Sequence, residues 1–260
     1  MTDTDIIVCC AGGIGNRFYS LLSTHHIYLC QGIRFKYWWP IHKNVLEANI
    51  TDLFESNQFE MVQALHPPKE GRYIKEKGDW VLDEVDLERD MPIYWDTPIA
   101  RWHTDETLPS LKNTFDSLKI KKDILDKINS IDVSNRLGIH IRGGDLRGKN
   151  PHEDDTRFVD GTSIINTIKY INNILKANKD ILLFGSCEDE VDKDILKQEF
   201  GSAIIQLDDC EHTRSSVQST KDAFANLVLL SKCDIIVGNI GSSFAAIAAI
   251  ISDKRYIPLT

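Results

Sequence analysis

The sequence lacks three features that would place it in common functional classes. It has no CxxC pair among its six cysteines, no hydrophobic run near the roughly 20 residues of a membrane span, and no basic excess. Its net charge of −9 argues against general nucleic-acid binding, which needs a basic surface. The acidic start resembles neither a signal peptide nor an anchor. We therefore expect a cytoplasmic protein with reduced cysteines, no transmembrane anchor and no nucleic-acid partner.

Apolar periodicity is the main structural signal of the first half of the chain. Residues 5–10 predict a buried strand, 17–31 a helix and 33–39 a second strand. Between residues 40 and 102, prolines and aromatic residues are scattered among charges, so we expect short strands and long loops there. Residues 108–131 predict a helix, and the end of this helix is the best candidate for a domain boundary.

The second half alternates strands and helices more regularly. This order predicts an α/β fold with parallel, doubly wound sheets, divided into a first domain at 1–134 and a second at 135–260. The expected strands are 137–142, 180–185, 203–207, 234–238 and 256–259, and the expected helices are 163–177, 188–200, 221–232 and 242–252.

The segment from Leu137 to Asp145 carries the most informative motif. A short apolar alternation leads directly into His140, Arg142 and Asp145. Ligands of open α/β sheets bind outside the carboxyl ends of strands, so an arginine there is placed to bind an anion. The alternative is an edge strand whose charges are only solvated.

A glycine-rich turn at residues 11–16 joins the first strand to its helix. Such a turn lets the backbone and helix amides approach an anion, and Asn16 and Arg17 beside it favour a binding edge over a simple bend. Phe18 stands where a GxGxxG motif requires its third glycine or alanine, which argues against a nicotinamide or flavin cofactor.

Two serines stand at a second helix start, where Ser242 and Ser243 follow a buried strand and a glycine turn. Serines at an N-cap normally satisfy the amides of their own helix. The same hydroxyls and amides also form a phosphate cradle. Because two such helix starts occur in one chain, we expect both to bind one diphosphate.

The loop after Arg142 supplies candidates for a general base. Glu153 is the first choice, followed by Asp154, Asp155 and Asp145, although acids in a charged loop are often only solvated. No metal is expected, since the DxD spacings of this chain fall at its start and within a predicted helix rather than at a strand end.

Three motifs together resemble a known family. HIRGGD, GGIGNR and DAFANLVLLSKCDIIVGNIGSSF are similar in order and spacing to motifs of the GT-B-fold fucosyltransferases. This group includes the α1,6- and protein O-fucosyltransferases and the rhizobial nodulation fucosyltransferase. The resemblance implies two Rossmann-like halves with a cleft between them. It places the nucleotide-sugar donor on the second half and the acceptor on the first.

The resemblance also implies residue roles. The arginine of HxRxxD, here Arg142, would bind the donor diphosphate, and His140 would lie near the base or ribose. Ser242 or Ser243 would meet phosphate and Phe244 the nucleoside. The glycine loop would face the same cleft with Gly13, Gly15, Asn16 and Arg17.

Three positions depart from the family pattern. Gly143 stands where the α1,6 enzymes carry a second arginine, and Asn150 stands where they carry a glutamate. Asn226 replaces the aspartate that reads guanine, and an amide cannot offer the paired acceptors of a carboxylate.

The expected function is therefore a metal-independent, inverting transfer of a sugar, with GDP-fucose the favoured donor and a glycan hydroxyl the acceptor. The alternatives are a transferase that uses a UDP- or ADP-linked sugar, a non-catalytic nucleotide- or carbohydrate-binding protein, and an oxidoreductase that uses the glycine turn.

Overall fold

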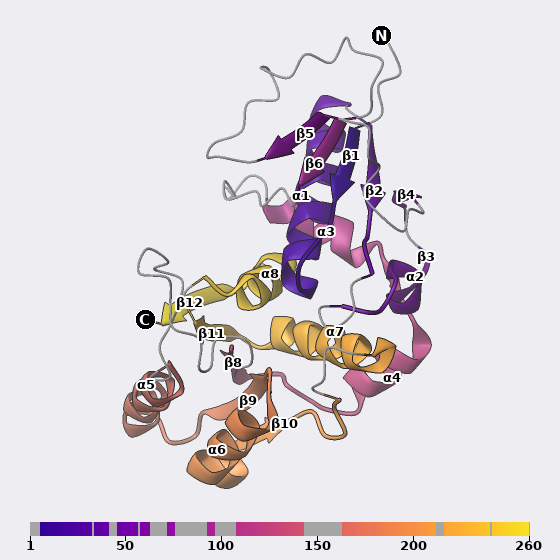
Figure 1. The fold of residues 1–260 in the computed structure, drawn as a ribbon. Helices are drawn as coiled ribbons and strands as arrows, with labels where there is room; N and C mark the ends of the chain where they lie inside the picture. The colour runs from indigo at the N-terminus through magenta and orange to yellow at the C-terminus, as the bar shows by residue number, and fades with distance from the viewer. Residues whose placement is uncertain are drawn as a thin grey trace. The chain divides into compact units, whose positions relative to one another are not determined.

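The computed structural model separates the chain into two compact units. One unit holds residues 1–121 and 214–220, and the other holds residues 122–213 and 221–260. Figure 1 shows their secondary structure. The residues described are 6–32, 34–41, 46–56, 58–62, 72–75, 93–96, 108–142, 163–211, 216–239 and 241–259.

The first unit is built on a parallel sheet in the order β4-β2-β1-β6-β5. Its central strand β1 pairs in parallel with β2 and with β6, as expected for a doubly wound sheet. The strands are β1 (Ile6–Cys9), β2 (Phe35–Trp38), β4 (Glu60–Val62), β5 (Arg72–Lys75) and β6 (Ile93–Asp96).

Helix α1 (Ile14–Gln31) packs against β1 and β2 and against α3 (Leu108–Asp116). Phe18, fully buried, explains why the glycine motif is incomplete, because its ring makes edge contacts with Trp39, Phe54 and Phe115. The helix begins three residues earlier than predicted. Burial of Ile14 one turn before Phe18 outweighs the low helix propensity of the adjacent glycines.

The second unit contains a parallel sheet in the order β10-β9-β8-β11-β12. Its strands are β8 (Arg136–Ile141), β9 (Leu182–Cys187), β10 (Ile204–Gln206), β11 (Ile235–Asn239) and β12 (Arg255–Leu259). Its longer helices are α5 (Ser163–Ala177), α6 (Glu190–Phe200), α7 (Val217–Lys232) and α8 (Ser243–Ser252), of which α7 begins in residues grouped with the first unit.

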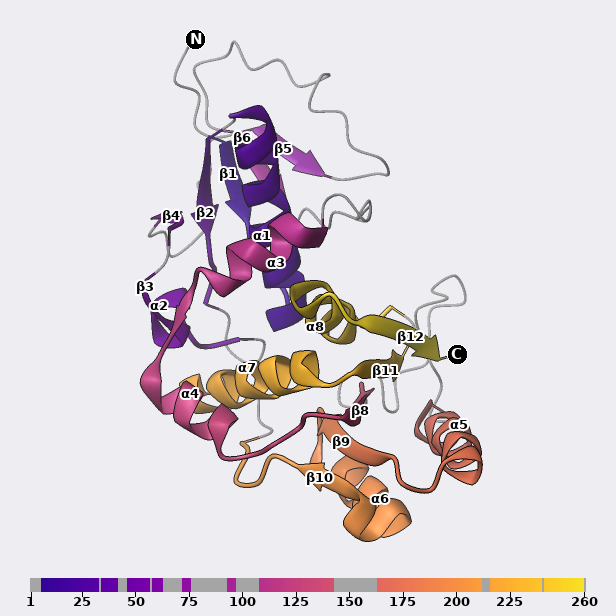
Figure 2. The same cartoon turned by 180° about the vertical axis from the view of Figure 1, so that it is seen from behind.

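Helices lie on both sides of this second sheet. Figures 1 and 2 show α5 and α6 on one side and α7 and α8 on the other. The buried aliphatic side chains of β8 and β9, such as Ile139 and Leu183, form one core cluster with those of α5 and α6. The predicted pattern of parallel strands covered by helices is confirmed.

One predicted helix is wrong in extent. Residues 108–131 form α3 and α4 (Lys122–Asn129), separated by the short strand β7 (Lys119–Ile120). β7 pairs with β3 (Phe54–Ser56), next to the short helix α2 (Ile50–Leu53), and Lys121 N donates to Leu53 O at 2.9 Å. This long-range pairing interrupts the helix. Along this part of the chain the first unit ends at Lys121 and the second begins at Lys122, whereas we predicted a domain boundary between residues 134 and 135.

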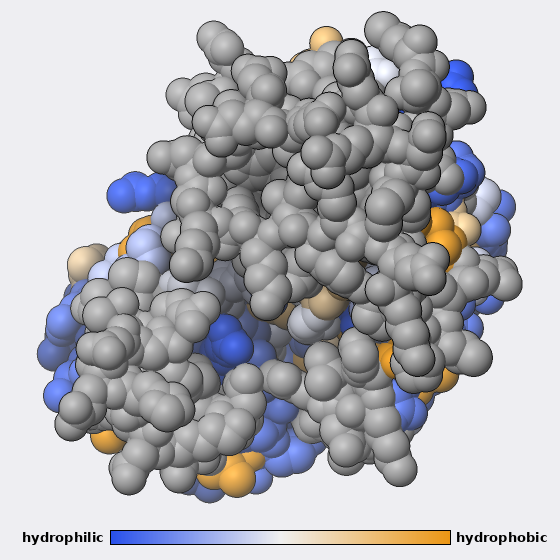
Figure 3. Space-filling model, turned by 45° about the horizontal axis from the view of Figure 1, so that its top comes forward, coloured by the Kyte–Doolittle hydropathy of each residue, from blue (hydrophilic) through white to orange (hydrophobic). Residues whose placement is uncertain are grey.

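Where described residues are visible on the face drawn in Figure 3, hydrophobic residues appear as separate small areas among hydrophilic ones. All six cysteines are free in this structure. Among the described residues, no helix combines the length and the hydropathy needed to cross a membrane.

Candidate functional site

Two neighbouring strands of the second unit end at the candidate site. β8 and β11 are parallel, with Gly238 opposite His140. Immediately beyond this pair, the side-chain oxygen Oδ1 of the buried Asn239 accepts a hydrogen bond from the backbone N of Arg142 at 2.8 Å. The backbone oxygen of Asn239 accepts from Tyr256 Oη at 2.7 Å and from Ser242 N at 3.0 Å. Asn239 thus ties the end of β8 to the turn that starts α8.

The start of α8 lies directly after this turn. Ser242 is the N-cap, and its Oγ accepts from Ala245 N at 3.3 Å, as the capping interpretation predicts. Ser243, half-buried, is the first helical residue. Gly238 allows the close approach of strand and helix, because a Cβ there would lie 2.9 Å from that of Ala245. The amides of the first helical turn therefore open at the same strand ends as Arg142.

His140 stacks on Phe244 with a centroid separation of 4.5 Å and an interplanar angle of 16°. His140 is 1% exposed, and among the described residues neither ring nitrogen has a hydrogen-bond partner of good geometry. Burial, and then the charge of Arg142, lower the pKa of His140 to about 3, which the backbone of Ser186 only weakly opposes. The imidazole is therefore neutral near pH 7 and offers a donor and an acceptor rather than a charge.

The burial of His140 predicts that the free energy of unfolding falls in acid. Its folded pKa of about 3 lies below the unfolded value of about 6.5, so the unfolded chain takes up this proton first as the pH falls. The stabilising contribution is present above pH 6.5 and is lost toward pH 3, by up to about 1.4 kcal/mol per pH unit.

Urea unfolding across this pH range tests the prediction. The variant His140→Gln should show a shallower loss of unfolding free energy than the parent. The variant His26→Gln, which changes a much less buried histidine, should keep most of the parental slope. Equal slopes for the parent and His140→Gln would contradict the prediction.

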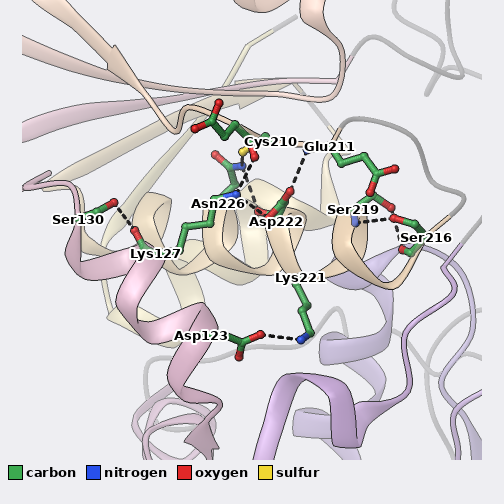
Figure 4. Close-up of polar contacts among 11 residues, drawn as sticks. Asp123, Lys127, Ser130, Cys210, Glu211, Ser216, Ser219, Lys221, Asp222 and Asn226 are labelled. Carbon is green, nitrogen blue, oxygen red and sulfur yellow. Dashed lines mark hydrogen bonds and ion pairs between the residues drawn. The ribbon is translucent and has the colours of Figure 1, made fainter.

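Asn226 lies in a polar cluster on α7 (Figure 4). Its Nδ2 donates to Asp222 O at 3.1 Å and to Cys210 Sγ at 3.4 Å. The buried Asp222 carboxylate pairs with Lys127 Nζ at 2.7 Å and accepts from Glu211 N at 2.8 Å. The side-chain nitrogen of Asn226 is therefore engaged within the protein.

The glycine loop belongs to the first unit. Gly13 is the exposed N-cap of α1, whereas Gly15 lies inside the helix and not in the predicted turn. Asn16 is half-buried and Arg17 is fully buried. Gly12 has a φ of +79°, and a Cβ there would lie 2.9 Å from Asn16 Nδ2, so the loop requires glycine at this position.

The candidate bases Asp145, Glu153 and Asp154 lie outside the described residues, and their roles stay predictions. A cavity of about 290 Å³ in the second unit is lined by residues 128, 129, 131–134 and Lys232. Residues 128–134 precede β8 and Lys232 precedes the parallel strand β11, whereas Arg142 follows β8, so this cavity lies at the wrong end of the strands to serve the site.

Sequence reasoning missed two residues of the site. Asn239 was only part of a longer motif and Tyr256 only the start of a strand, yet their hydrogen bonds hold the turn that leads to α8. Asn239 could have been identified from the sequence, because it is an asparagine at a strand end immediately before a glycine turn.

The second unit thus brings together Arg142, the neutral His140 on Phe244, and the amides and hydroxyls at Ser242 and Ser243. A guanidinium and a helix N-terminus at one sheet edge favour the binding of an anion, and the stacked rings favour a flat or apolar neighbouring group. Together these features suit a molecule with a phosphate and an aromatic or sugar moiety.

Comparison with known proteins gives matches to solved structures only. No protein-family model and no curated protein matches the sequence. NodZ α-1,6-fucosyltransferase co-crystallized with GDP is 12% identical, with a TM-score of 0.65 over 100% of this chain and 96% of that chain. NodZ from Bradyrhizobium in its selenomethionine form gives the same values.

POFUT1 in complex with GDP is 10% identical, with a TM-score of 0.57 over 100% of this chain and 99% of that chain. The likeness extends over both units, and each unit carries a five-stranded parallel sheet. The chain therefore has the GT-B-like fold of these fucosyltransferases.

Proposed function

We propose that this protein is a glycosyltransferase that moves L-fucose from GDP-fucose to a hydroxyl of a glycan. The acceptor oxygen forms the new bond to the anomeric carbon while the bond to the diphosphate breaks, which inverts the configuration. GDP leaves with the bonding electron pair, and the acceptor proton passes to a base. The reaction needs no metal in this proposal, because the positive groups of the protein bind the leaving diphosphate.

The observation that carries the proposal is the 2.8 Å hydrogen bond between Arg142 N and Asn239 Oδ1. It fixes the end of β8 beside the start of α8, so that Arg142 and the helix amides can bind the same diphosphate. Preorganised donors of this kind stabilise the charge that develops on a leaving group. Solved structures of the same fold hold GDP and GDP-fucose, which supports this assignment.

In this proposal His140 and Phe244 lie beside the ribose or base, and Asn226 reads the base. Glu153 is the first candidate to remove the acceptor proton, followed by Asp154 and Asp145. A role for the glycine loop, with Gly13, Gly15, Asn16 and Arg17, in binding the donor or the acceptor is part of the same proposal.

Asn226 favours a second candidate donor. The side-chain nitrogen of Asn226 donates to Asp222 O and Cys210 Sγ. Only the side-chain oxygen therefore remains to accept a hydrogen bond from a base. Guanine would lose one of the two hydrogen bonds that a carboxylate accepts, and a UDP- or ADP-linked sugar would then compete. A protein that only binds the nucleotide is the other alternative.

Thermal unfolding in the presence of different nucleotides distinguishes these candidate functions. We expect GDP to raise the melting temperature more than UDP, ADP, CMP or dTDP at equal concentration, because ligand that binds only the folded state stabilises it by mass action. Release of free sugar from radiolabelled GDP-fucose then distinguishes an enzyme from a binder. A larger rise in melting temperature with UDP or ADP would contradict GDP as the preferred nucleotide, and absence of sugar release would contradict catalytic activity.

A further inference from the structure

We propose that the last turns of α1 form a site for a thiophilic divalent cation such as Zn²⁺, with Cys30 Sγ and a ring nitrogen of His26 as its two protein ligands. Neither residue has a role in the proposed transfer reaction. A helix rises about 1.5 Å per residue, so Cys30 lies roughly 24 Å along the axis of α1 from Ile14, which begins the helix beside the glycine loop. The inference therefore goes beyond the proposed function and does not depend on it.

The spacing and geometry of the pair suit a shared metal ion. Residues four positions apart lie on one face of a helix, as do the two histidines of helical zinc motifs with this spacing. Cys30 Sγ lies 3.4 Å from His26 Nε2 and 3.8 Å from His26 Nδ1. A tetrahedral zinc ion with ordinary bond lengths places a sulfur and a nitrogen ligand about 3.5 Å apart. A small turn of the imidazole therefore directs a nitrogen lone pair at an ion that the sulfur also reaches.

The two side chains are accessible and have the chemistry of soft ligands. Of the six cysteines, all of which the structure describes, only Cys30 is exposed, and His26 is half-buried. Burial lowers the pKa of His26, so its imidazole is neutral near pH 7 and keeps a lone pair for a metal. The thiol loses its proton when it binds the ion. Sulfur and imidazole favour zinc over Mg²⁺ and Ca²⁺, which take oxygen ligands.

The position in the helix favours a bound cation over a reactive thiolate. The helix macrodipole gives the C-terminal end of α1 a negative potential, and its last turn contains no basic residue. Reactive cysteines occur instead at helix N-termini or beside positive groups, which stabilise the thiolate. The lowered pKa of His26 also makes it a weaker proton acceptor than an ordinary imidazole. The end of α1 therefore stabilises a metal ion on Cys30 and not a free thiolate.

The pair fills only part of the coordination shell. Among the residues that the structure describes, no three His, Cys, Asp or Glu side chains form a group that could hold a metal. A structural zinc site normally has four protein ligands. With two protein ligands, and water in the remaining positions, this site should bind one exchangeable ion per chain.

Metal titration of the full-length chain, with tris(carboxyethyl)phosphine as the reductant, tests the site. We expect Co²⁺ to give a thiolate-to-metal charge-transfer band, and Zn²⁺ to remove the band because it binds more tightly. Cys30→Ser should abolish the band, and Cys30→Ser and His26→Gln should each weaken Zn²⁺ binding about ten-fold or more. His25→Gln is the matched control. It changes the adjacent histidine, whose ring packs against Phe59 at 5.3 Å, and should keep the parental Zn²⁺ affinity.

A second substitution distinguishes metal binding from a purely structural contact between the two side chains. Cys30→His restores two ligands at the same spacing, so it should recover most of the Zn²⁺ affinity that Cys30→Ser loses, without the sulfur band. One equivalent of Zn²⁺ should also slow alkylation of Cys30 by iodoacetamide in the parent, whereas Mg²⁺ should not.

Equal Zn²⁺ affinity in the parent, Cys30→Ser and His26→Gln would overturn the proposal, and so would a Co²⁺ complex without a sulfur band. Release of sugar from GDP-fucose should stay at the parental level in Cys30→Ser, because the pair takes no part in the proposed reaction. Failure of the proposed function would therefore leave the metal titration unchanged.

Discussion

Replacing Arg142 with alanine is expected to lower donor turnover by about a hundred- to a thousand-fold, the usual effect of removing one preorganised donor to a developing charge. The site keeps its backbone geometry, because Asn239 holds the amide and not the side chain of Arg142. Only the guanidinium is lost, so the diphosphate leaves with less stabilisation. Release of radiolabelled sugar from GDP-fucose, per folded molecule, measures this effect.

Arg136 provides the matched control. It starts the same strand, β8, at the opposite end, where its Nε donates to Asp132 O at 3.1 Å. Arg136→Ala removes the same charge from the same strand and should change turnover only slightly. Parental turnover in Arg142→Ala, or an equal loss in both variants, would contradict a role for Arg142 at the diphosphate.

Replacing Asp222 with alanine is expected to cost about 3 kcal/mol of unfolding free energy, the lower end for one partner of a buried ion pair. Its side chain is 2% exposed and joins Lys127 of α4 to the backbone of Glu211. The variant leaves a buried amide and a largely buried ammonium without this carboxylate. Lys127 is 22% exposed and still donates to Asp209 O, which keeps the cost at this lower end.

A second ion pair between the same two helices gives the control (Figure 4). Lys221 Nζ lies 2.6 Å from Asp123 Oδ2, but the Asp123 side chain is 55% exposed. Asp123→Ala should cost only about 0.2 to 1 kcal/mol because solvent screens this pair. Urea unfolding of both variants measures the difference, and equal losses would show that burial does not set the strength of the Asp222 contact.

The second unit was largely predictable because its signals are local. Helix α5 spans the predicted residues 163–177, and β8 lies within one residue of its prediction. Parallel strands buried on both faces give continuous apolar runs, and the helices between them show regular spacing. Ser242 was recognised as a cap because a serine after a glycine turn has a direct physical reason to stand there.

The sequence-based predictions fail where residues far apart in the sequence determine the local structure. Residues 117–121 have an acceptable helical pattern, but Lys119 and Ile120 pair with β3, more than 60 residues earlier in the chain. The burial of Arg17 could not be predicted from the sequence either, because a charged side chain is normally exposed and only the fold places Trp39 against it. Asn239 carries no charge and drew no attention, although three hydrogen bonds at the site depend on it.

Amide hydrogen exchange with and without saturating GDP is the most direct test of where the diphosphate binds. The account predicts that GDP slows exchange at Ser243 and Phe244, whose first-turn amides have no acceptor within α8, and at Arg142, whose existing hydrogen bond to Asn239 is stabilised when the ligand binds. Protection confined to other segments, with no change at Arg142 or at the start of α8, would contradict the assignment of the donor site to the ends of β8 and β11.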